Sequence, residues 1–361
     1  MALFDAQEDE QRIRNLFTLN VLFWEYEKTP GNGAWGLAVL LRQKGVAEVD
    51  GRKADRIVLK VGINFGEGQL RNETAFLKHI VRLGGAVDNL NVSQSYNRFP
   101  PLGFAFDAVA GINGPVIALE YLDGGDCMWS FDRIQSHFAR PPNRVLWSIF
   151  LCYRACIGMA YPANANLSTP LTLEEISPDR EPGSMAHNDI APRNIIIASG
   201  DGIGEHGIGH TFKLIDFGQA SLAEDAGAKV SVSPSLDIYT NDLSFNYFMI
   251  TFVTMSPGRS MRTVDYAGHE THAAAILPSP QAPNPYPWLY PQLAGVISRC
   301  QYRDARQRPE LAKLLAQARN VVLHRTAGLY PNPEDETDDA IRDFCQRSVI
   351  GSLDTAIFYQ I

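Results

Sequence analysis

The chain has 361 residues, of which 45% are hydrophobic and 20% are charged, and its formal net charge is −8. This length is enough for two packed domains, and the composition is that of an ordinary globular protein. Because the charge is negative and no run reaches the roughly 18 apolar residues of a membrane helix, we expect neither a nucleic-acid partner nor a membrane partner.

The N-terminal residues and the cysteines predict the compartment. Residues 1–10 are acidic and lack an apolar core, so they are not expected to act as a secretory signal. The five cysteines are odd in number and scattered, which is typical of reduced thiols rather than of a disulfide framework. They are Cys127, Cys152, Cys156, Cys300 and Cys345. The sequence therefore predicts a cytoplasmic or nuclear protein.

The N-terminal third of the chain has the pattern of a helix followed by a sheet. Residues 8–20 show the spacing of a short amphipathic helix, and residues 68–83 that of a second helix, which ends at Gly84 and Gly85. Apolar runs rich in β-branched and aromatic residues, separated by Gly- and Asp-rich turns, indicate strands. These strands are expected over residues 21–26, 37–41, 56–61, 103–109 and 115–121.

Near residue 122 the pattern changes from strands to helices, and we place a domain boundary there. Helices are expected over residues 128–138, 142–160, 242–255, 287–300 and 309–325. Segments rich in Pro, Gly, Ser or Thr are expected to be surface insertions, at residues 161–183, 199–210 and 256–286. The acidic run at 333–339 is expected to be solvated. The predicted division is an N-terminal extension at 1–20, a sheet-rich part at 21–122, a helical part at 123–325 and a tail at 326–361.

Three glycines in a short turn form a candidate phosphate-binding segment. Gly31, Gly33 and Gly36 fit the spacing Gly-x-Gly-x-x-Gly between two expected strands. Glycines at such positions let backbone N–H groups approach phosphate oxygens closely. The alternative is a plain β-hairpin turn. A dinucleotide-binding fold would place a helix after the glycines, and the strand expected here disfavours that fold.

A lysine and a glutamate stand out within apolar patterns of the N-terminal third. Lys60 ends an apolar strand-like run, where a lysine alone would be expected to face solvent. Glu73 lies on the expected helix with Leu70, Leu77 and Ile80 at helical spacing, so its carboxylate is expected to face inward with the apolar stripe. A buried carboxylate needs a partner.

Two polar segments beside apolar runs carry the strongest functional signal. Residues 187–194 supply Asp189 and Asn194, and a later apolar run ends in Asp216, followed by Phe and Gly. Two carboxylates and an amide oxygen are hard ligands that can hold Mg²⁺ against the phosphates of a nucleotide. One aspartate would remain free to orient or deprotonate an attacking hydroxyl. If these residues only capped loops, neither the spacing of five between Asp189 and Asn194 nor the Phe-Gly after Asp216 would be expected.

These motifs, in this order, resemble the catalytic loop and the Asp-Phe-Gly turn of the eukaryotic protein-kinase superfamily. The resemblance covers most of the chain and implies an α+β, bilobal protein-kinase-like fold with a β-rich N-lobe and a mainly helical C-lobe. It implies that ATP binds between the lobes with Mg²⁺, or with Mn²⁺. It also implies that Lys60 pairs with Glu73 and holds the α- and β-phosphates, that Asp189 is the catalytic base, and that Asn194 and Asp216 are the metal ligands.

The same resemblance assigns roles to residues 119–126 and to a late arginine. The segment is similar to a kinase hinge, so that backbone groups around Glu120 and Leu122 would bond the adenine and Asp126 would lie near the ribose. The Arg-Pro at Arg308 is similar to a late kinase element in which the arginine is buried.

Departures from the kinase pattern concern the catalytic loop and the acceptor. Asn188 stands where an arginine is usual, and Ala191 where Ser/Thr kinases have a lysine. Arg193, four residues after Asp189, is positioned as in tyrosine kinases and is the candidate to stabilise the transferring phosphate; the alternative is a surface residue. The Ala-Pro-Glu motif that closes the activation segment is missing.

The predicted function is ATP-dependent phosphoryl transfer to a hydroxyl. The expected acceptor is Ser or Thr of a protein, although without the Ala-Pro-Glu motif the usual peptide platform is missing. One alternative is a small-molecule kinase of the aminoglycoside or choline type, which usually lacks the Asp-Phe-Gly and late Arg-Pro elements. Another is a pseudokinase that only binds a nucleotide or a partner, and a third is transfer of AMP.

Overall fold

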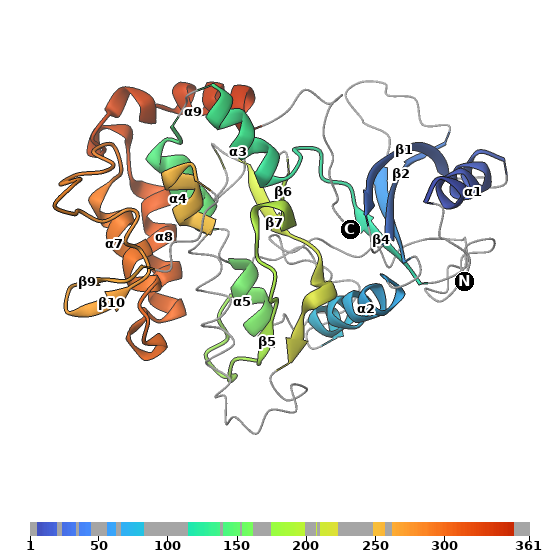
Figure 1. Ribbon diagram of the computed structural model, residues 1–361, viewed down its shortest axis with the longest axis horizontal. Helices are drawn as coiled ribbons and strands as arrows, with labels where there is room; N and C mark the ends of the chain where they lie inside the picture. Colours follow the sequence, from blue (N-terminus) through green and yellow to red (C-terminus); the bar gives the residue numbers. More distant parts are fainter. Residues whose placement is uncertain are drawn as a thin grey trace.

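The computed structural model shows a mixed α and β protein that contains a four-stranded antiparallel sheet. The sheet lies toward one end of the molecule and most of the helices toward the other (Figure 1). The structure describes residues 6–19, 24–33, 36–44, 56–62, 66–82, 115–137, 140–151, 154–161, 175–198, 207, 210–222, 248–256 and 262–349. Within these ranges no helix combines the length and the apolar character that crossing a membrane requires.

The sheet follows the predicted strands. Its strands, in spatial as well as chain order, are β1 (Trp24–Gly33), β2 (Gly36–Gln43), β3 (Arg56–Gly62) and β4 (Val116–Glu120). β1 is longer than predicted, because it continues through Gly31 to pair Gly33 with Gly36 of β2. The strand predicted over 103–109 lies outside the described residues.

Side chains alternate between the two faces of the sheet and build two cores. One face packs on α1 (Ala6–Leu19) through Ile13 and Phe17, and its sheet residues include Leu37, Val39, Leu41, Ile57 and Leu59. The other face joins the main core beside α2 (Gly66–Arg82), through Ala38, Leu40, Val58, Ile117 and Leu119. This alternation has the period of two that a strand imposes. Because Phe17 is fully buried, the predicted N-terminal extension contributes to the core of the sheet.

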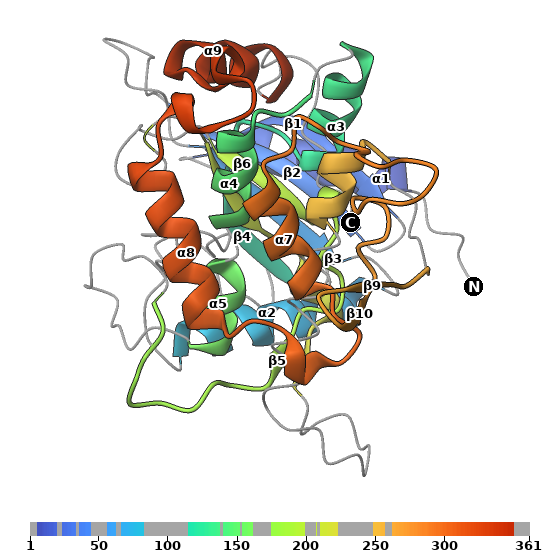
Figure 2. The same ribbon diagram turned by 90° about the vertical axis from the view of Figure 1, so that its left-hand side faces the viewer.

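The predicted helices of the second part are present. They are α3 (Cys127–Ser136), α4 (Asn143–Leu151), α5 (Arg154–Ala160), a turn of helix at 248–254, α7 (Pro291–Cys300) and α8 (Leu311–His324). α4 and α5 fall within the predicted helix 142–160, and residues 152–153 between them lie outside the described residues. α7 begins later than predicted, at Pro291, which suits a proline in the first helical turn. α4 packs along α8, as Figure 2 shows.

Short antiparallel strand pairs lie between these helices in the chain. β5 (Met185–Ala186) pairs with β8 (Ser221–Leu222), and β6 (Ile195–Ala198) pairs with β7 (Thr211–Leu214). A third pair, β9 (Val264–Tyr266) with β10 (His269–Thr271), lies within the predicted surface insertion 256–286. Part of this insertion is core rather than surface, because Thr271 and Ala273 are fully buried and Thr271 Oγ1 donates to Ser298 O at 2.7 Å.

The link from the sheet to α3 is fastened to β6. Gly124 N donates to Ile197 O at 2.9 Å, and Ile197 N donates to Gly125 O at 2.8 Å. A Cβ at residue 124 would lie 2.6 Å from Ile197 O, so this close approach requires glycine. The link therefore fixes the sheet against the β6–β7 hairpin. The two polar loops adjoin this hairpin: residues 187–194 lie just before β6, and the turn at Asp216 lies just after β7.

The tail corrects one prediction. The acidic run at 333–339 is not uniformly solvated, because Glu336 is only 1% exposed. Its Oε1 accepts hydrogen bonds from Asn143 N (2.6 Å) and Asn143 Nδ2 (2.9 Å), and its Oε2 accepts one from Arg144 N (2.9 Å). Free N–H groups at a helix N-terminus attract a carboxylate, and α4 provides them. The chain then forms α9 (Asp338–Phe344).

Glu336→Gln is expected to lower the free energy of unfolding by about 1.5–3 kcal/mol, the range for hydrogen bonds that involve a charged group. Glutamine keeps the shape, but it loses the charge at the N-terminus of α4 and one accepting oxygen. Urea unfolding followed by circular dichroism measures the change. Glu334→Gln is the matched control, because Glu334 is exposed. Equal stability of the two variants would contradict the role given to Glu336.

Candidate active site

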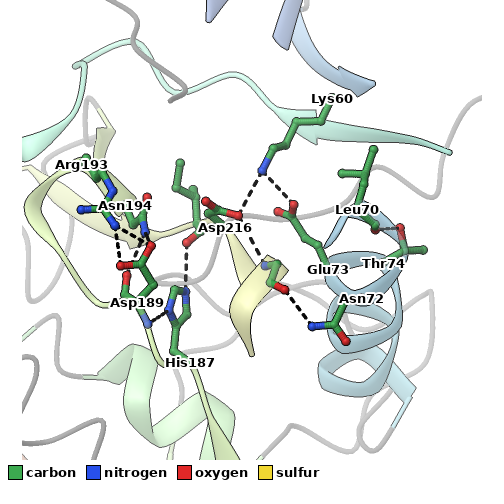
Figure 3. Close-up of polar contacts among 12 residues, drawn as sticks. Lys60, Leu70, Asn72, Glu73, Thr74, His187, Asp189, Arg193, Asn194 and Asp216 are labelled. Atoms are coloured by element: carbon green, nitrogen blue, oxygen red, sulfur yellow. Dashed lines mark hydrogen bonds and ion pairs between the residues drawn. The ribbon is translucent and has the colours of Figure 1, made fainter. Parts of the chain in front are cut away.

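A cavity of about 200 Å³ lies between the sheet, α2 and the two polar loops. Residues far apart in the sequence line it, including Lys60, Glu73, Asp189, Arg193, Asp216 and Gln219. Figure 3 shows the side chains of Lys60 and Glu73 on one side and those of Asp189, Arg193 and Asn194 on the other, with Asp216 between them. The structure therefore gathers in one place the residues predicted to act in catalysis and metal binding.

The predicted ion pair between Lys60 and Glu73 is present. Lys60 Nζ lies 2.8 Å from Glu73 Oε2, and both side chains are 3% exposed. Lys60 Nζ also lies 3.5 Å from Asp216 Oδ1, on a side chain that is 26% exposed. Burial opposes the charge on Lys60, but the two carboxylates outweigh it and raise the pKa of the lysine above its ordinary value. Lys60 is therefore a permanent cation in the cavity.

The position of Glu73 follows from the pattern of α2. Leu70 and Leu77 on the same helix are 4% exposed, so the stripe of the helix that contains them faces the core. Glu73 lies between them in that stripe and reaches the end of β3, where Lys60 points back toward the helix (Figure 3). This confirms the inward orientation that the helical spacing predicts.

His187 ties the two polar loops together. Its ring is fully buried; Nδ1 accepts a hydrogen bond from Asp189 N at 3.3 Å, and Nε2 lies 3.0 Å from Ile215 O. Burial lowers the pKa of the imidazole. A neutral ring with the proton on Nε2 satisfies both contacts. The sequence alone assigned His187 no role; the signal was a histidine two residues before the candidate base, next to an apolar run.

The carboxylate of Asp189 is held by two neighbours. Arg193 Nη2 lies 2.5 and 2.6 Å from its two oxygens, and Asn194 Nδ2 donates to Asp189 Oδ2 at 2.9 Å and to Asp189 O at 2.8 Å. Arg193 thus contacts the candidate base directly, and its side chain remains 39% exposed at the cavity. The arrangement fixes the direction in which the oxygens of Asp189 point.

The predicted metal ligands suit a cation of the Mg²⁺ type. Both contacts of the Asn194 Nδ2 group are made to Asp189, so the amide oxygen is the atom left to bind a cation. Ile215 N donates to Asn194 O at 2.9 Å, which places Asp216 next to Asn194. Among the described residues no group of three or more His, Cys, Asp or Glu could hold a metal ion. Two oxygen ligands fit Mg²⁺, which usually takes its remaining ligands from water and substrate phosphates.

The glycines predicted to bind phosphate lie in the β1–β2 hairpin. Gly31 pairs with Ala38 and Gly33 pairs with Gly36, so the glycines lie where β1 turns into β2. A strand therefore follows them, as expected. Residues 34–35 at its tip lie outside the described residues. As far as the structure describes the cavity, these glycines are not among its lining residues.

The residues predicted to bind adenine and ribose lie around the link to α3. Glu120 ends β4 and pairs with Ile57, and Leu122 is buried. Asp126 is the N-cap of α3: its Oδ1 accepts a hydrogen bond from Trp129 N at 2.7 Å, and burial raises its pKa to about 6. This capping role was not predicted. A ribose would have to share the carboxylate of Asp126 with the helix.

The late arginine differs from its prediction. Arg308 is half-buried rather than buried, and its Nε donates to Tyr302 O at 2.8 Å. It turns toward the backbone at the end of α7, so it takes part in a local turn.

Taken together, the site presents a buried lysine, a carboxylate braced by an arginine, and two oxygen ligands. Such a set can bind phosphate, neutralise charge through a divalent ion and accept a proton from a hydroxyl. The chain matches no family model and shows no match to a curated protein.

Proposed function

We propose that this protein has a bilobal, protein-kinase-like fold and transfers the γ-phosphoryl group of ATP to a hydroxyl. The observation that carries the proposal is the contact of one buried lysine, Lys60, with both Glu73 and Asp216, in a cavity that Asp189 also lines. An ion pair buried in a protein costs desolvation and does not by itself stabilise the fold, which favours a role in function.

Each group has a part in the proposed transfer. Lys60 binds phosphate oxygens of ATP, and Asn194 and Asp216 hold Mg²⁺ or Mn²⁺, which neutralises phosphate charge when bound. Asp189 orients the acceptor hydroxyl and accepts its proton. The hydroxyl oxygen forms a bond to the γ-phosphorus while the bond from that phosphorus to the β–γ bridging oxygen breaks, leaving ADP.

The acceptor is proposed to be a hydroxyl of a protein Ser or Thr or of a small molecule. Asp189 and Arg193 lie where the acceptor would enter, with side chains 27% and 39% exposed. The carboxylate of Asp189 can accept a hydrogen bond from the acceptor hydroxyl, and the guanidinium of Arg193 can donate one to a neighbouring oxygen of the acceptor.

A first test is binding. Mg²⁺–ATP at about 100 times its Kd is expected to stabilise the protein by roughly 2.7 kcal/mol, because only the folded state has the site. Thermal unfolding with increasing Mg²⁺–ATP measures the effect, and Mn²⁺ is tested in parallel. Asp216→Asn is expected to weaken the metal-dependent part of the shift. An unfolding midpoint that does not move at millimolar nucleotide would contradict the proposal.

A second test concerns Arg193. Arg193→Ala is expected to lower kcat by about 10²-fold, the effect of losing one preorganised charged group, with little change in the KM for ATP. The reason is that Arg193 braces Asp189 and lies beside the transferring phosphate rather than the nucleotide. Arg193→Lys should recover only part of the rate, because an ammonium is a point charge without the planar fork of the guanidinium. Parent-like kinetics of Arg193→Ala would remove Arg193 from the site.

A further inference from the structure

The main chain that follows Asp216 is held from one side by α2. Asn72 donates from Nδ2 to the carbonyl oxygens of Gly218 at 2.9 Å and Ala220 at 3.0 Å. Gly218 packs closely here: a Cβ at this residue would lie 3.5 Å from Cβ of Gln69 on the same helix. One amide group thus satisfies two carbonyls of the segment 218–221.

The same segment is held from the other side by the loop before Asp189. Asn188 donates from Nδ2 to the carbonyl oxygen of Gln219 at 3.0 Å and contacts Ser221 Oγ at 2.9 Å. Asn188 has a φ of 63°, in the left-handed region that asparagine tolerates better than most residues. Three successive carbonyls, from 218 to 220, therefore accept hydrogen bonds from uncharged amides on two different elements.

Asp216 needs such support. Its φ of 64° lies in the left-handed region, which persists in a residue other than glycine only when the surroundings hold it. Its Oδ1 contacts, to Lys60 Nζ at 3.5 Å and to Gly218 N at 3.4 Å, are both long. The position of the carboxylate therefore depends on the main chain that follows it more than on its own contacts.

We infer that Asn72 and Asn188 are positioning residues that clamp segment 218–221 and so hold Asp216 ready to bind the metal ion. The metal role of Asp216 rests on the proposed function. The clamp contains no charged group, so it needs no phosphate or other charged modification to form. Since Asn72 precedes Glu73 on α2, a displacement of α2 would release the Asn72 half of the clamp and the Lys60 ion pair together.

The test removes each half of the clamp without adding charge. Asn72→Leu keeps a similar size on a helix, and Asn188→Gly keeps the left-handed backbone. Thr74→Val is the matched control, because Thr74 on α2 donates only within the helix, to Leu70 O at 2.7 Å. Hydrogen exchange of peptides covering residues 216–222, thermal unfolding, and kcat with the apparent KM for Mg²⁺ are measured on all four proteins.

Each clamp variant is expected to exchange the amides of 216–222 about tenfold faster, which corresponds to about 1.4 kcal/mol, with exchange in α4 and α8 unchanged. The apparent KM for Mg²⁺ should rise about tenfold, because a smaller fraction of the variant protein has Asp216 in the position that binds the ion. At saturating Mg²⁺ the bound ion holds Asp216 in that position, so kcat should stay within about twofold of the parent value. A loss of general stability would instead lower kcat and leave that KM unchanged.

Two outcomes would overturn the inference: unchanged exchange of 216–222 in both variants, or the same change in Thr74→Val. The exchange comparison needs no catalysis, so it judges the clamp even if the parent protein transfers no phosphate. In that case the proposed function would fail while faster exchange in both variants would still support the clamp.

Discussion

Asp189→Asn is expected to lower the rate of phosphoryl transfer by about 10²–10⁴-fold, the usual contribution of a positioned general base. The affinity for Mg²⁺–ATP should stay nearly the same, because Asp189 lies on the other side of Asp216 from Lys60, the proposed phosphate-binding residue. Asparagine keeps the shape and one accepting oxygen, but it cannot take a proton at neutral pH. Initial rates and calorimetric binding of Mg²⁺–ATP, measured on the same preparation, separate the two quantities.

A matched control for this variant is Asp132→Asn, on the exposed side of α3. It makes the same chemical change outside the cavity, so its rate should equal that of the parent. If Asp189→Asn retained the parent rate, the assignment of Asp189 as the base would be wrong. If both variants lost activity together, the loss would reflect general sensitivity to these substitutions.

Lys60→Met is expected to have the largest effect on stability. It leaves the Glu73 carboxylate without its partner at 3% exposure, and breaking a buried ion pair on one side costs about 3–5 kcal/mol. Activity should also be lost, because Lys60 is the residue proposed to bind the phosphates of ATP. Urea unfolding at neutral pH measures the change in the free energy of unfolding.

The double variant Lys60→Met/Glu73→Leu distinguishes stability from function. Replacing both partners with apolar residues of similar size removes the unpaired charge, so most of the stability should return. Activity should not return, because the phosphate-binding cation is still missing. Recovery of both, or a single variant as stable as the parent, would contradict the role of this pair.

Local patterns in the sequence predicted the elements that depend on local spacing. The stripe of Leu70, Glu73 and Leu77 faces the core because helix geometry places these positions on one face. The strands β2 and β3 were predicted by the same logic, from apolar runs with turn residues between them. The inward orientation of Glu73 could be predicted from this stripe, whereas its pairing with Lys60 was expected from the resemblance to protein kinases.

Contacts between distant segments could not be predicted in the same way. Glu336 is one of several acidic residues in a run that looks solvated, and only the docking of the tail on the N-terminus of α4 buries it. Thr271 and Ala273 lie in a proline-rich stretch that reads as surface, but they pack on the end of α7. Asn72 and Asn188 have no local signal, because their partners lie in segment 218–221.

The measurement that tests the central claim most directly follows the γ-phosphate and the α-phosphate of ATP separately. Reactions with γ-labelled and α-labelled ATP are run in parallel, with Mg²⁺ or Mn²⁺, on the parent protein and on Asp189→Asn. We expect the γ-label to move to protein or to an added hydroxyl acceptor, the α-label to stay in ADP, and Asp189→Asn to remove the transfer. Label transferred from α-labelled ATP, or a parent protein that binds Mg²⁺–ATP and moves neither label, would contradict phosphoryl transfer.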